Sequence, residues 1–344
     1  MLFFKSNIDA SRSLKDLKGT GVLACICATL PVVQIDETPI PFLTVDFEQG
    51  NQIFDYFQQC ISNNQDPIIK YGQAEILEGK ETYIKVPQFS SRGPNSFAPE
   101  ILKLLVLIYL QHILLLGGDN GFKLLSGTSM EAPHITGIVA LLKVAHPDWS
   151  SAAIKSALMT TAWNEDTYAT EIYTEGTGGK LADPFDIGSG ICNPNGAVDP
   201  GLIYDMDTND YSIMFADWDT VMMKFTMQLR GIACLKEVHS RLDMNLPSIS
   251  IPNLKDSVTL KRTVTNVGNV YSVYKLVVKP PRNTAIKVTP DVLKFNAKIK
   301  KISFEVKITS TYQQSSKFTF GSLAWSDGKH FVRIPIVVRK QIDE

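Results

Sequence analysis

The sequence predicts an α/β fold class for the larger, N-terminal part of the chain and an all-β sandwich for the remainder. Three observations lead to this prediction. Short apolar runs alternate with a helical pattern between Gly21 and Pro87, two apolar helical patterns follow up to about Asp207, and two-residue alternation begins near Met244. A period of about 3.6 residues indicates helices and a period of two indicates half-buried strands. The length of 344 residues suits about two or three domains.

The first region, from Gly21 to Pro87, has the order strand, strand, helix, strand. Its apolar runs are GVLACICA, LPVVQID and DPIIKYGQAEI, and NQIFDYFQQCIS is the helix candidate before the last of them. This alternation is typical of a small α/β or α+β unit.

The second region contains two helix candidates and a loop. In SMEAPHITGIVALLKVAHP, apolar residues lie nearly all round and small residues permit close approach, so we expect a buried helix. In HPDWSSAAIKSALMTTA, Ser150 or Ser151 can cap a helix whose apolar stripe is Ala152, Ile154, Ala157 and Leu158. The segment GSGICNPNGAVDPGLIYD is rich in Gly, Pro and Asn and is expected to be a loop.

The third region is predicted to be a β-sandwich of six or seven short strands. ISFEVKIT places Ile302, Phe304, Val306 and Ile308 on one face. SLAWSDGKHFVRIPIVV is expected to form a hairpin that turns at Asp327-Gly328. TLKRTVTNVG, YSVYKLVVK and AIKVTPDVLKF supply the other strands, at a density typical of sandwiches.

Charge and cysteine content exclude some functions. The net charge of −1 argues against nucleic acid as the principal partner, although the part from Met244 onward holds seventeen Lys and Arg against six Asp and Glu. That part carries about +11 and the remainder about −12, and solvated lysines on outward strand positions are a sufficient explanation. The five cysteines (Cys25, Cys27, Cys60, Cys192 and Cys234) show no zinc or redox spacing and leave the redox compartment undecided.

One serine stands in a context that suits chemistry. In LSGTSMEAPHITG, Ser129 lies at the predicted start of a helix, where free backbone N–H groups and the positive end of the helix dipole can stabilise an oxyanion. Gly127 allows close approach, Thr128 can brace the turn, and Pro133 is expected in the first turn, where a missing N–H costs little. On the tripeptide Gly-Thr-Ser alone, a helix-capping serine would be the simpler interpretation.

A longer stretch resembles a known family. LSGTSMEAPHITGIVALLKVAHPDWSSAAIKSALMTTA is similar to the nucleophile segment of subtilisin-like serine proteases, in particular the plant, cucumisin-like branch. FSSRGPN, FDIGSGICNPNGAVDPGLIYD and LKRTVTNVG extend the resemblance over most of the chain. It implies Ser129 as nucleophile, framed by Gly127, Thr128 and Met130, with His134 in a structural role.

The resemblance also implies a domain organisation. The fold class becomes α/β, as a partial subtilisin-like doubly wound domain, plus a C-terminal all-β fibronectin type III-like sandwich. Residues 1–86 would be the remnant of a protease-associated (PA) domain, 87–243 the C-terminal part of the catalytic domain, and 244–344 the fibronectin type III-like domain.

Two departures from the family pattern bear on activity. The family's triad runs Asp, His, Ser along the chain, and the histidine before Ser129 is His112, which lacks the His-Gly-Thr context of the family's base. We therefore expect the Asp and His to be absent and catalysis to be impaired. The apolar run Leu104 to Leu116 replaces a turn of the family; a buried strand or helix, an error in the gene model and a membrane anchor are its possible explanations.

The function expected from the sequence is thus that of a subtilisin-like serine endopeptidase with impaired turnover. The alternatives are a non-catalytic protein-interaction module and a truncated gene product. We expect a protein or peptide substrate, no nucleic acid, no membrane, no cofactor and no metal. The resemblance implies an extracellular, apoplastic setting, and no signal peptide is recognised in MLFFKSNIDASRSLKDLKG.

Overall fold

The structure is a computed structural model, and it divides into two compact units that are described separately. One unit comprises residues 1–91, 109–130 and 172–181, and the other comprises 92–108, 131–171 and 182–344. The residues that the structure describes are 22–25, 42–45, 47–68, 70, 84–87, 89–102, 113–115, 123–125, 127–165, 169–175, 180–216, 240–311 and 317–341.

The first unit contains small strand pairs and one long helix. Strand β1 (Val22–Cys25) runs parallel to β2 (Phe42–Val45), and helix α2 (Phe47–Ser62) follows directly. The expected strand LPVVQID lies outside the described residues, and the partner of β1 is FLTV, residues 42–45. The further pairs are parallel β3–β6 (Lys85–Val86 and Tyr173–Thr174) and antiparallel β4–β5 (Ile113–Leu115 and Lys123–Leu125).

The apolar run Leu104 to Leu116 is described only at Ile113–Leu115, which is strand β4. The rest of the run lies outside the described residues, so the choice between strand and helix is answered only for this end.

Helix α4 (Ser151–Thr160) confirms its sequence pattern. Ser150 is the N-cap, and its Oγ accepts a hydrogen bond from the N–H of Ala153 at 2.9 Å. The stripe of Ala152, Ile154, Ala157 and Leu158 is buried. Of this stripe, Ile154, Ala157 and Leu158 belong to an apolar cluster that also contains Trp149 and Leu142.

Helix α3 (Thr128–Ala145) is present, but the expectation that it is buried is wrong. Of its residues only Leu142 is buried, while Leu141 and Val144 are 72% and 79% exposed. One stripe, formed by Ile135, Ile138, Val139 and Leu142, packs into the cluster of α4. An apolar pattern all round a helix leads to burial only where neighbours cover every face, and in the described part of the chain only this stripe is covered.

The segment GSGICNPNGAVDPGLIYD, Gly188 to Asp205, contains regular structure, so the prediction that it is a loop is wrong in part. It includes helix α6 (Pro194–Val198) and strand β7 (Leu202–Ile203), and helix α5 (Pro184–Ile187) lies directly before it. Each helix has a proline at its start and an Asp or Asn cap before it, Asp183 and Asn193, and this combination stabilises a single helical turn within a Gly- and Pro-rich sequence. Helix α7 (Thr208–Ala216) follows.

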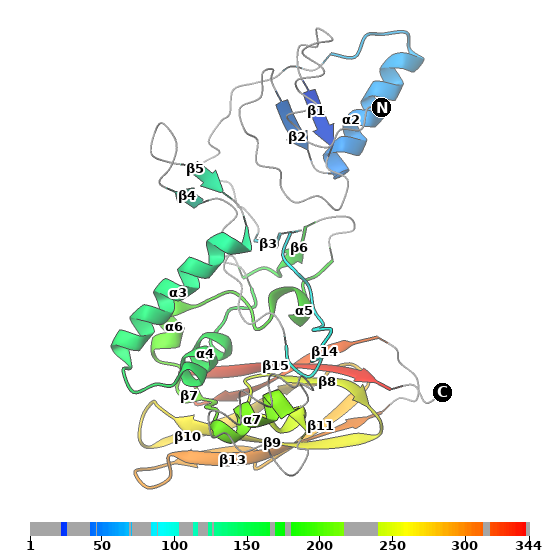
Figure 1. Ribbon diagram of the computed structural model, residues 1–344. Helices are drawn as coiled ribbons and strands as arrows, with labels where there is room; N and C mark the ends of the chain where they lie inside the picture. Colours follow the sequence, from blue (N-terminus) through cyan, green and yellow to red (C-terminus); the bar gives the residue numbers. More distant parts are fainter. Residues whose placement is uncertain are drawn as a thin grey trace. The chain divides into compact units, whose positions relative to one another are not determined.

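The C-terminal part confirms the predicted sandwich (Figure 1). One sheet has the order β12-β10-β14-β15-β8 and the other β11-β13-β9-β7. After a short 3₁₀ turn, η1 (Arg241–Asp243), the strands are β8 (Ile249–Leu254), β9 (Ser257–Asn266), β10 (Ser272–Lys279), β11 (Thr284–Thr289), β12 (Val292–Phe295), β13 (Lys301–Ser310), β14 (Thr319–Ser326) and β15 (Phe331–Lys340).

The strand pattern read from the sequence holds in detail. On β13, Phe304, Val306 and Ile308 are buried, whereas Ser303, Glu305 and Lys307 are exposed. Strands β14 and β15 form the expected antiparallel hairpin, and Gly328 in its turn has a φ of 91°. Strand β8, which the sequence analysis had not singled out, pairs in parallel with β15.

The sandwich and the segment before it share one core. Strand β7 extends the second sheet through the pairs Leu202 with Asn266 and Ile203 with Thr265. Leu202 and Tyr204 are fully buried among sandwich residues such as Phe304 and Trp325. Residues 202–204 are therefore held to the sandwich by both backbone pairing and apolar packing.

Candidate functional site

Ser129, the predicted nucleophile, is the second residue of α3 and its side chain is exposed. Ser129 lies inside a turn that is closed by a 2.9 Å hydrogen bond from the N–H of Met130 to the carbonyl oxygen of Gly127. Gly127 has a φ of 154°, in the region that side-chain-bearing residues avoid. The structure thus places Gly127, Thr128, Ser129 and Met130 in one tight turn at the amino end of a helix.

The position of this turn suits stabilisation of a negative charge. The first N–H groups of a helix have no acceptor within the helix, and they lie at the positive end of its dipole. An oxyanion formed near Ser129 would be stabilised by these N–H groups and by the positive end of the dipole. An exposed hydroxyl also leaves room for a substrate carbonyl to approach.

Pro133 differs from its expected position in the first turn. It is the sixth residue of α3, inside the helix. Its nitrogen carries no hydrogen, so it cannot donate to the carbonyl oxygen of Ser129 four residues earlier. The backbone of Ser129 is therefore free of one of the usual helical bonds.

Glu131 is a neighbour to which the sequence analysis gave no role. Burial raises the pKa of its carboxyl from 4.5 to about 7, and its Oε1 is buried without a hydrogen-bond partner. The sequence does give one signal for Glu131. It is an acidic residue two positions after the serine, in a turn that could bind an anion. Near neutral pH about half of these carboxyls are therefore uncharged, which reduces repulsion of an oxyanion at the same turn.

The structure describes one of the two histidines that flank Ser129 in the sequence. His134 is exposed and lies five residues after Ser129 on the same helix, about 140° around the helical axis. It is not directed to the side of the helix that carries Ser129. His112 lies outside the described residues.

Two of the family-like motifs meet in space. Arg92 of FSSRGPN pairs with the buried Asp186 of FDIGSG, and the N–H of Gly93 donates to the carbonyl oxygen of Phe185 at 2.9 Å. A Cβ on Gly93 would lie 2.5 Å from Cδ1 of Phe185, which explains the glycine. Asp186 also completes a capping box with Asp183, so these motifs serve as scaffold.

An open pocket of about 570 Å³ lies between α7 and the second sheet. Asp205, Asp207 and Asp210 contribute carboxylates to it, but these accept hydrogen bonds from backbone N–H groups at turns and helix starts. These three carboxylates therefore stabilise the backbone around the pocket. Ser129 does not line this pocket.

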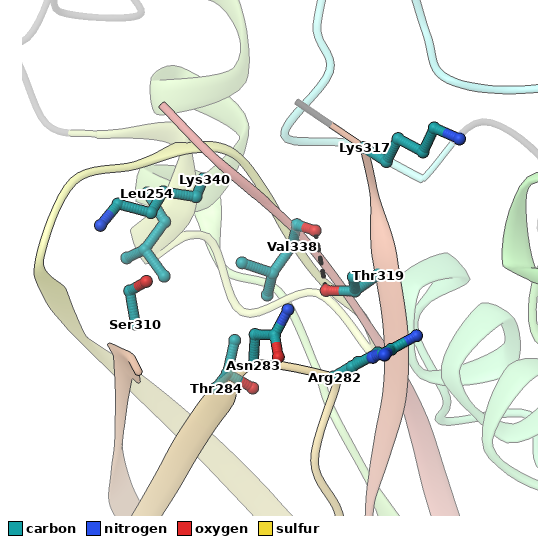
Figure 2. A pocket seen from close by; sticks show the side chains of 9 residues that line it. All are labelled: Leu254, Arg282, Asn283, Thr284, Ser310, Lys317, Thr319, Val338 and Lys340. Atoms are coloured by element: carbon teal, nitrogen blue, oxygen red, sulfur yellow. Dashed lines mark hydrogen bonds between the residues drawn. The ribbon is translucent and has the colours of Figure 1, made fainter. Parts of the chain in front are cut away.

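A second hollow lies at one end of the sandwich (Figure 2). Its cavity volume of about 10 Å³ would hold about one water molecule. Thr319 Oγ1 donates to the carbonyl oxygen of Val338 across it at 3.2 Å, and the charged ends of Arg282, Lys317 and Lys340 point away from its centre. A hollow of this size is too small for a ligand larger than water.

The described residues also bear on metals and membranes. Among them, no three His, Cys, Asp or Glu side chains are placed to hold a metal ion. Within the same ranges, no helix combines the length and apolar character needed to span a bilayer.

The comparisons with known proteins agree with this arrangement. Residues 29–190 match the model of the Subtilase family, and residues 243–338 match that of the fibronectin type-III domain. The first match includes the turn at Ser129, and the second covers most of the sandwich.

Relatives from Arabidopsis thaliana match along nearly the whole chain. Subtilisin-like protease SBT3.3 is 43% identical over 349 residues, SBT3.8 is 44% identical over 344, and SBT3.11 is 44% identical over 320. These alignments cover 98%, 97% and 90% of this chain but 44%, 44% and 41% of the relatives. The chain thus spans less than half the length of the curated relatives it matches.

Proposed function

Since this chain belongs to the subtilase family of plant subtilisin-like proteases, we propose that Ser129 is the nucleophile of peptide-bond hydrolysis. The observation that supports the proposal most directly is the exposed hydroxyl of Ser129 in the first turn of α3. A serine in this position has its reacting oxygen close to free helical N–H groups.

In the proposed reaction, Oγ of Ser129 attacks the carbonyl carbon of the scissile peptide bond. The negative charge that develops on the carbonyl oxygen is stabilised by backbone N–H groups of the turn. The C–N bond breaks, and the amine leaves with the proton given up by Ser129 Oγ. Water then attacks the acyl-enzyme, the bond to Oγ breaks, and a proton from the water restores the hydroxyl. Gly127 keeps the approach to the serine open, and the bond from the N–H of Met130 to the carbonyl oxygen of Gly127 holds the turn.

The proton of Ser129 Oγ needs an acceptor, and here the chain departs from its family. His112 precedes Ser129 without the sequence context of a catalytic base, and His134 lies on another side of α3. We propose that the 344-residue polypeptide, taken by itself, is catalytically impaired. Loss of triad partners typically lowers the rate on the order of 10⁴- to 10⁶-fold.

A fluorophosphonate probe tests both parts of this proposal on the full chain. We expect weak labelling that is abolished in Ser129→Ala and retained in Ser257→Ala, a matched change at an exposed serine on β9. Labelling of Ser129→Ala equal to that of the unchanged chain would exclude Ser129 as the nucleophile. Rapid labelling together with turnover of peptide substrates would contradict the proposal that catalysis is impaired.

The domain organisation and setting form part of the same proposal. Residues 1–86 would derive from a protease-associated domain, 87–243 from the catalytic domain and 244–344 from the fibronectin type III-like domain. The substrates would be proteins or peptides, as the relatives' description as subtilisin-like proteases suggests. The resemblance to the plant branch of the family implies an extracellular setting. Nucleic acid and membrane partners are not expected.

A non-catalytic interaction module remains the second candidate, and one pairing in the sandwich favours it. Lys287 on β11 lies directly opposite Lys307 on β13, with both side chains exposed. Like charges at such positions are destabilising unless something else compensates them. Capture of an acidic partner by the full chain, weakened in Lys307→Gln and unchanged at about 0.15 M salt, would support this role. Binding that disappears at that salt concentration would indicate nonspecific attraction.

A further inference from the structure

His330 occupies an unusual position in the turn between β14 and β15. Its side chain is almost fully buried, with the residue 8% exposed, and it immediately precedes Phe331, the first residue of β15. Its Nδ1 lies 2.9 Å from Oδ2 of Asp327, and its backbone N–H donates to Oδ1 of the same carboxylate at 2.6 Å. Asp327 thus fixes both the backbone and the ring of His330.

A second carboxylate faces the other ring nitrogen. Nε2 of His330 lies 3.1 Å from Oδ2 of Asp199, a residue that follows α6 and precedes β7. The contact has the distance of an ion pair but not the angle of a hydrogen bond. Nζ of the exposed Lys329 reaches the same oxygen at 2.6 Å. The imidazole therefore lies between two carboxylates that come from different parts of the chain.

The backbone beside Asp199 is packed tightly against this group. A Cβ on Gly201 would lie 2.5 Å from Oη of Tyr274 and 2.8 Å from Cγ of His330. The carbonyl oxygen of Gly201 accepts hydrogen bonds from the N–H groups of Val267 at 2.9 Å and Gly268 at 3.1 Å. Displacement of the segment around Asp199 would therefore disturb the sandwich at Val267 and Gly268.

The chemistry of this arrangement depends on one proton. A neutral imidazole has a donor at one ring nitrogen and an acceptor at the other, so one of its nitrogens would present a lone pair to a carboxylate. An imidazolium has a donor at each nitrogen and carries the positive charge that both carboxylates attract. Asp199 and Asp327 contact the ring, Lys329 contacts Asp199, and the hydroxyl of Tyr274 interacts electrostatically with both carboxylates.

We propose that His330 is a proton-dependent latch, which when protonated holds the segment from Asp199 to Gly201 against the β14–β15 turn of the sandwich. Loss of the proton removes the attraction to Asp199 and loosens this segment. Asp327 keeps the ring in place in either state through its bond to Nδ1. The latch joins residues 199–201 to the sandwich within one compact unit, independently of whether Ser129 is active.

The charge balance around the ring supports the latch. Burial lowers the pKa of His330, but the contacts with Asp327 and Asp199 outweigh burial and leave the pKa above its usual 6.5. A raised pKa in the folded state means that the stabilisation is complete below the pKa of the unfolded chain. It is lost as the pH rises through the folded pKa. The segment is therefore held in mildly acidic solution and released in alkaline solution.

Two measurements on the full chain test the latch. A titration of the imidazole signals by NMR should give His330 a pKa above the usual value, and Asp199→Asn should lower it. Amide hydrogen exchange at Val267 and Gly268, corrected for the intrinsic pH dependence, should lose protection as the pH rises from about 5.5 to about 8.5. Asp199→Asn should show the reduced protection already at the acidic end.

The matched control is Lys329→Gln, which removes the other partner of Asp199 but leaves the titrating ring in place. It should retain the pH dependence of protection at Val267 and Gly268. His330→Gln should abolish this dependence, and if it fails to fold, the Asp199→Asn comparison still decides. A His330 pKa at or below the usual value, or identical pH profiles in the unchanged chain and Asp199→Asn, would overturn the proposal.

Discussion

The ring of Phe304 meets the ring of Trp325 edge to face, with 5.0 Å between their centroids. Phe304 comes from β13 in one sheet and Trp325 from β14 in the other, so this contact bridges the two layers of the sandwich. Both residues are essentially inaccessible to solvent. Such pairs contribute about 1 kcal/mol beyond the area they bury.

Replacing Phe304 by Ala should therefore lower the free energy of unfolding by about 3–5 kcal/mol, because it removes this contact and leaves a cavity. Denaturant unfolding followed by tryptophan fluorescence measures the change. Phe331→Ala is the control, since Phe331 is 53% exposed and its truncation should cost less than about 1 kcal/mol. Equal losses for the two variants would contradict the role of the bridge.

A comparison of alanine substitutions at Gly201 and Gly328 separates the cost of backbone strain from the cost of side-chain crowding. Both have positive φ, 75° and 91°, but a Cβ on Gly201 would collide with Tyr274 and His330, whereas nothing lies within 4 Å of one on Gly328. Gly328→Ala should lower the free energy of unfolding by about 1 kcal/mol from backbone strain alone. Gly201→Ala should lower it by about 3 kcal/mol, because overpacking adds to the strain. Thermal unfolding of both variants under one condition tests the difference.

Asn245 connects three segments through its side chain. Its Nδ2 donates to the carbonyl oxygens of Asp205 at 2.7 Å and Thr263 at 2.9 Å, and its Oδ1 accepts from the N–H of Thr263 at 2.8 Å. Asn245→Ala should lower the free energy of unfolding by about 2–3 kcal/mol, since partly buried backbone groups lose their partners.

The control for Asn245 is Asn253→Ala, at an exposed asparagine that accepts from Arg339 at 3.0 Å. We expect a loss below about 1 kcal/mol there, because water can replace the lost bond. Hydrogen exchange at Thr263 should also rise in Asn245→Ala and stay unchanged in Asn253→Ala.

Glu131 gives the start of α3 a pH dependence of its own. Burial raises the pKa of its carboxyl from 4.5 to about 7, so the folded state favours the protonated form. Stability is complete below the unfolded pKa of about 4.5 and falls as the pH rises through about 7. Glu131→Gln should therefore match the unchanged chain in melting temperature near pH 4.5 and exceed it near pH 8. A lower melting temperature of Glu131→Gln near pH 8 would show that the carboxylate is stabilised in the fold.

The sequence by itself determined the features that depend on short-range patterns. The alternation in ISFEVKIT set which face of β13 is buried, Ser150 set the start of α4, and Asp327-Gly328 set the turn between β14 and β15. It also placed Ser129 at the amino end of a helix. These features follow from residues only a few positions apart, where backbone geometry and side-chain period act directly.

Tertiary structure decided the features that depend on distant segments. The sequence pattern of α3 does not show that Leu141 and Val144 are exposed. The sequence of β8 does not show that this strand pairs in parallel with β15. Asp199 and His330 meet only because β7 joins the second sheet and the β14–β15 turn closes over it. The groups that come to share a low-dielectric environment are brought together from distant parts of the chain. No local period in a sequence encodes such contacts.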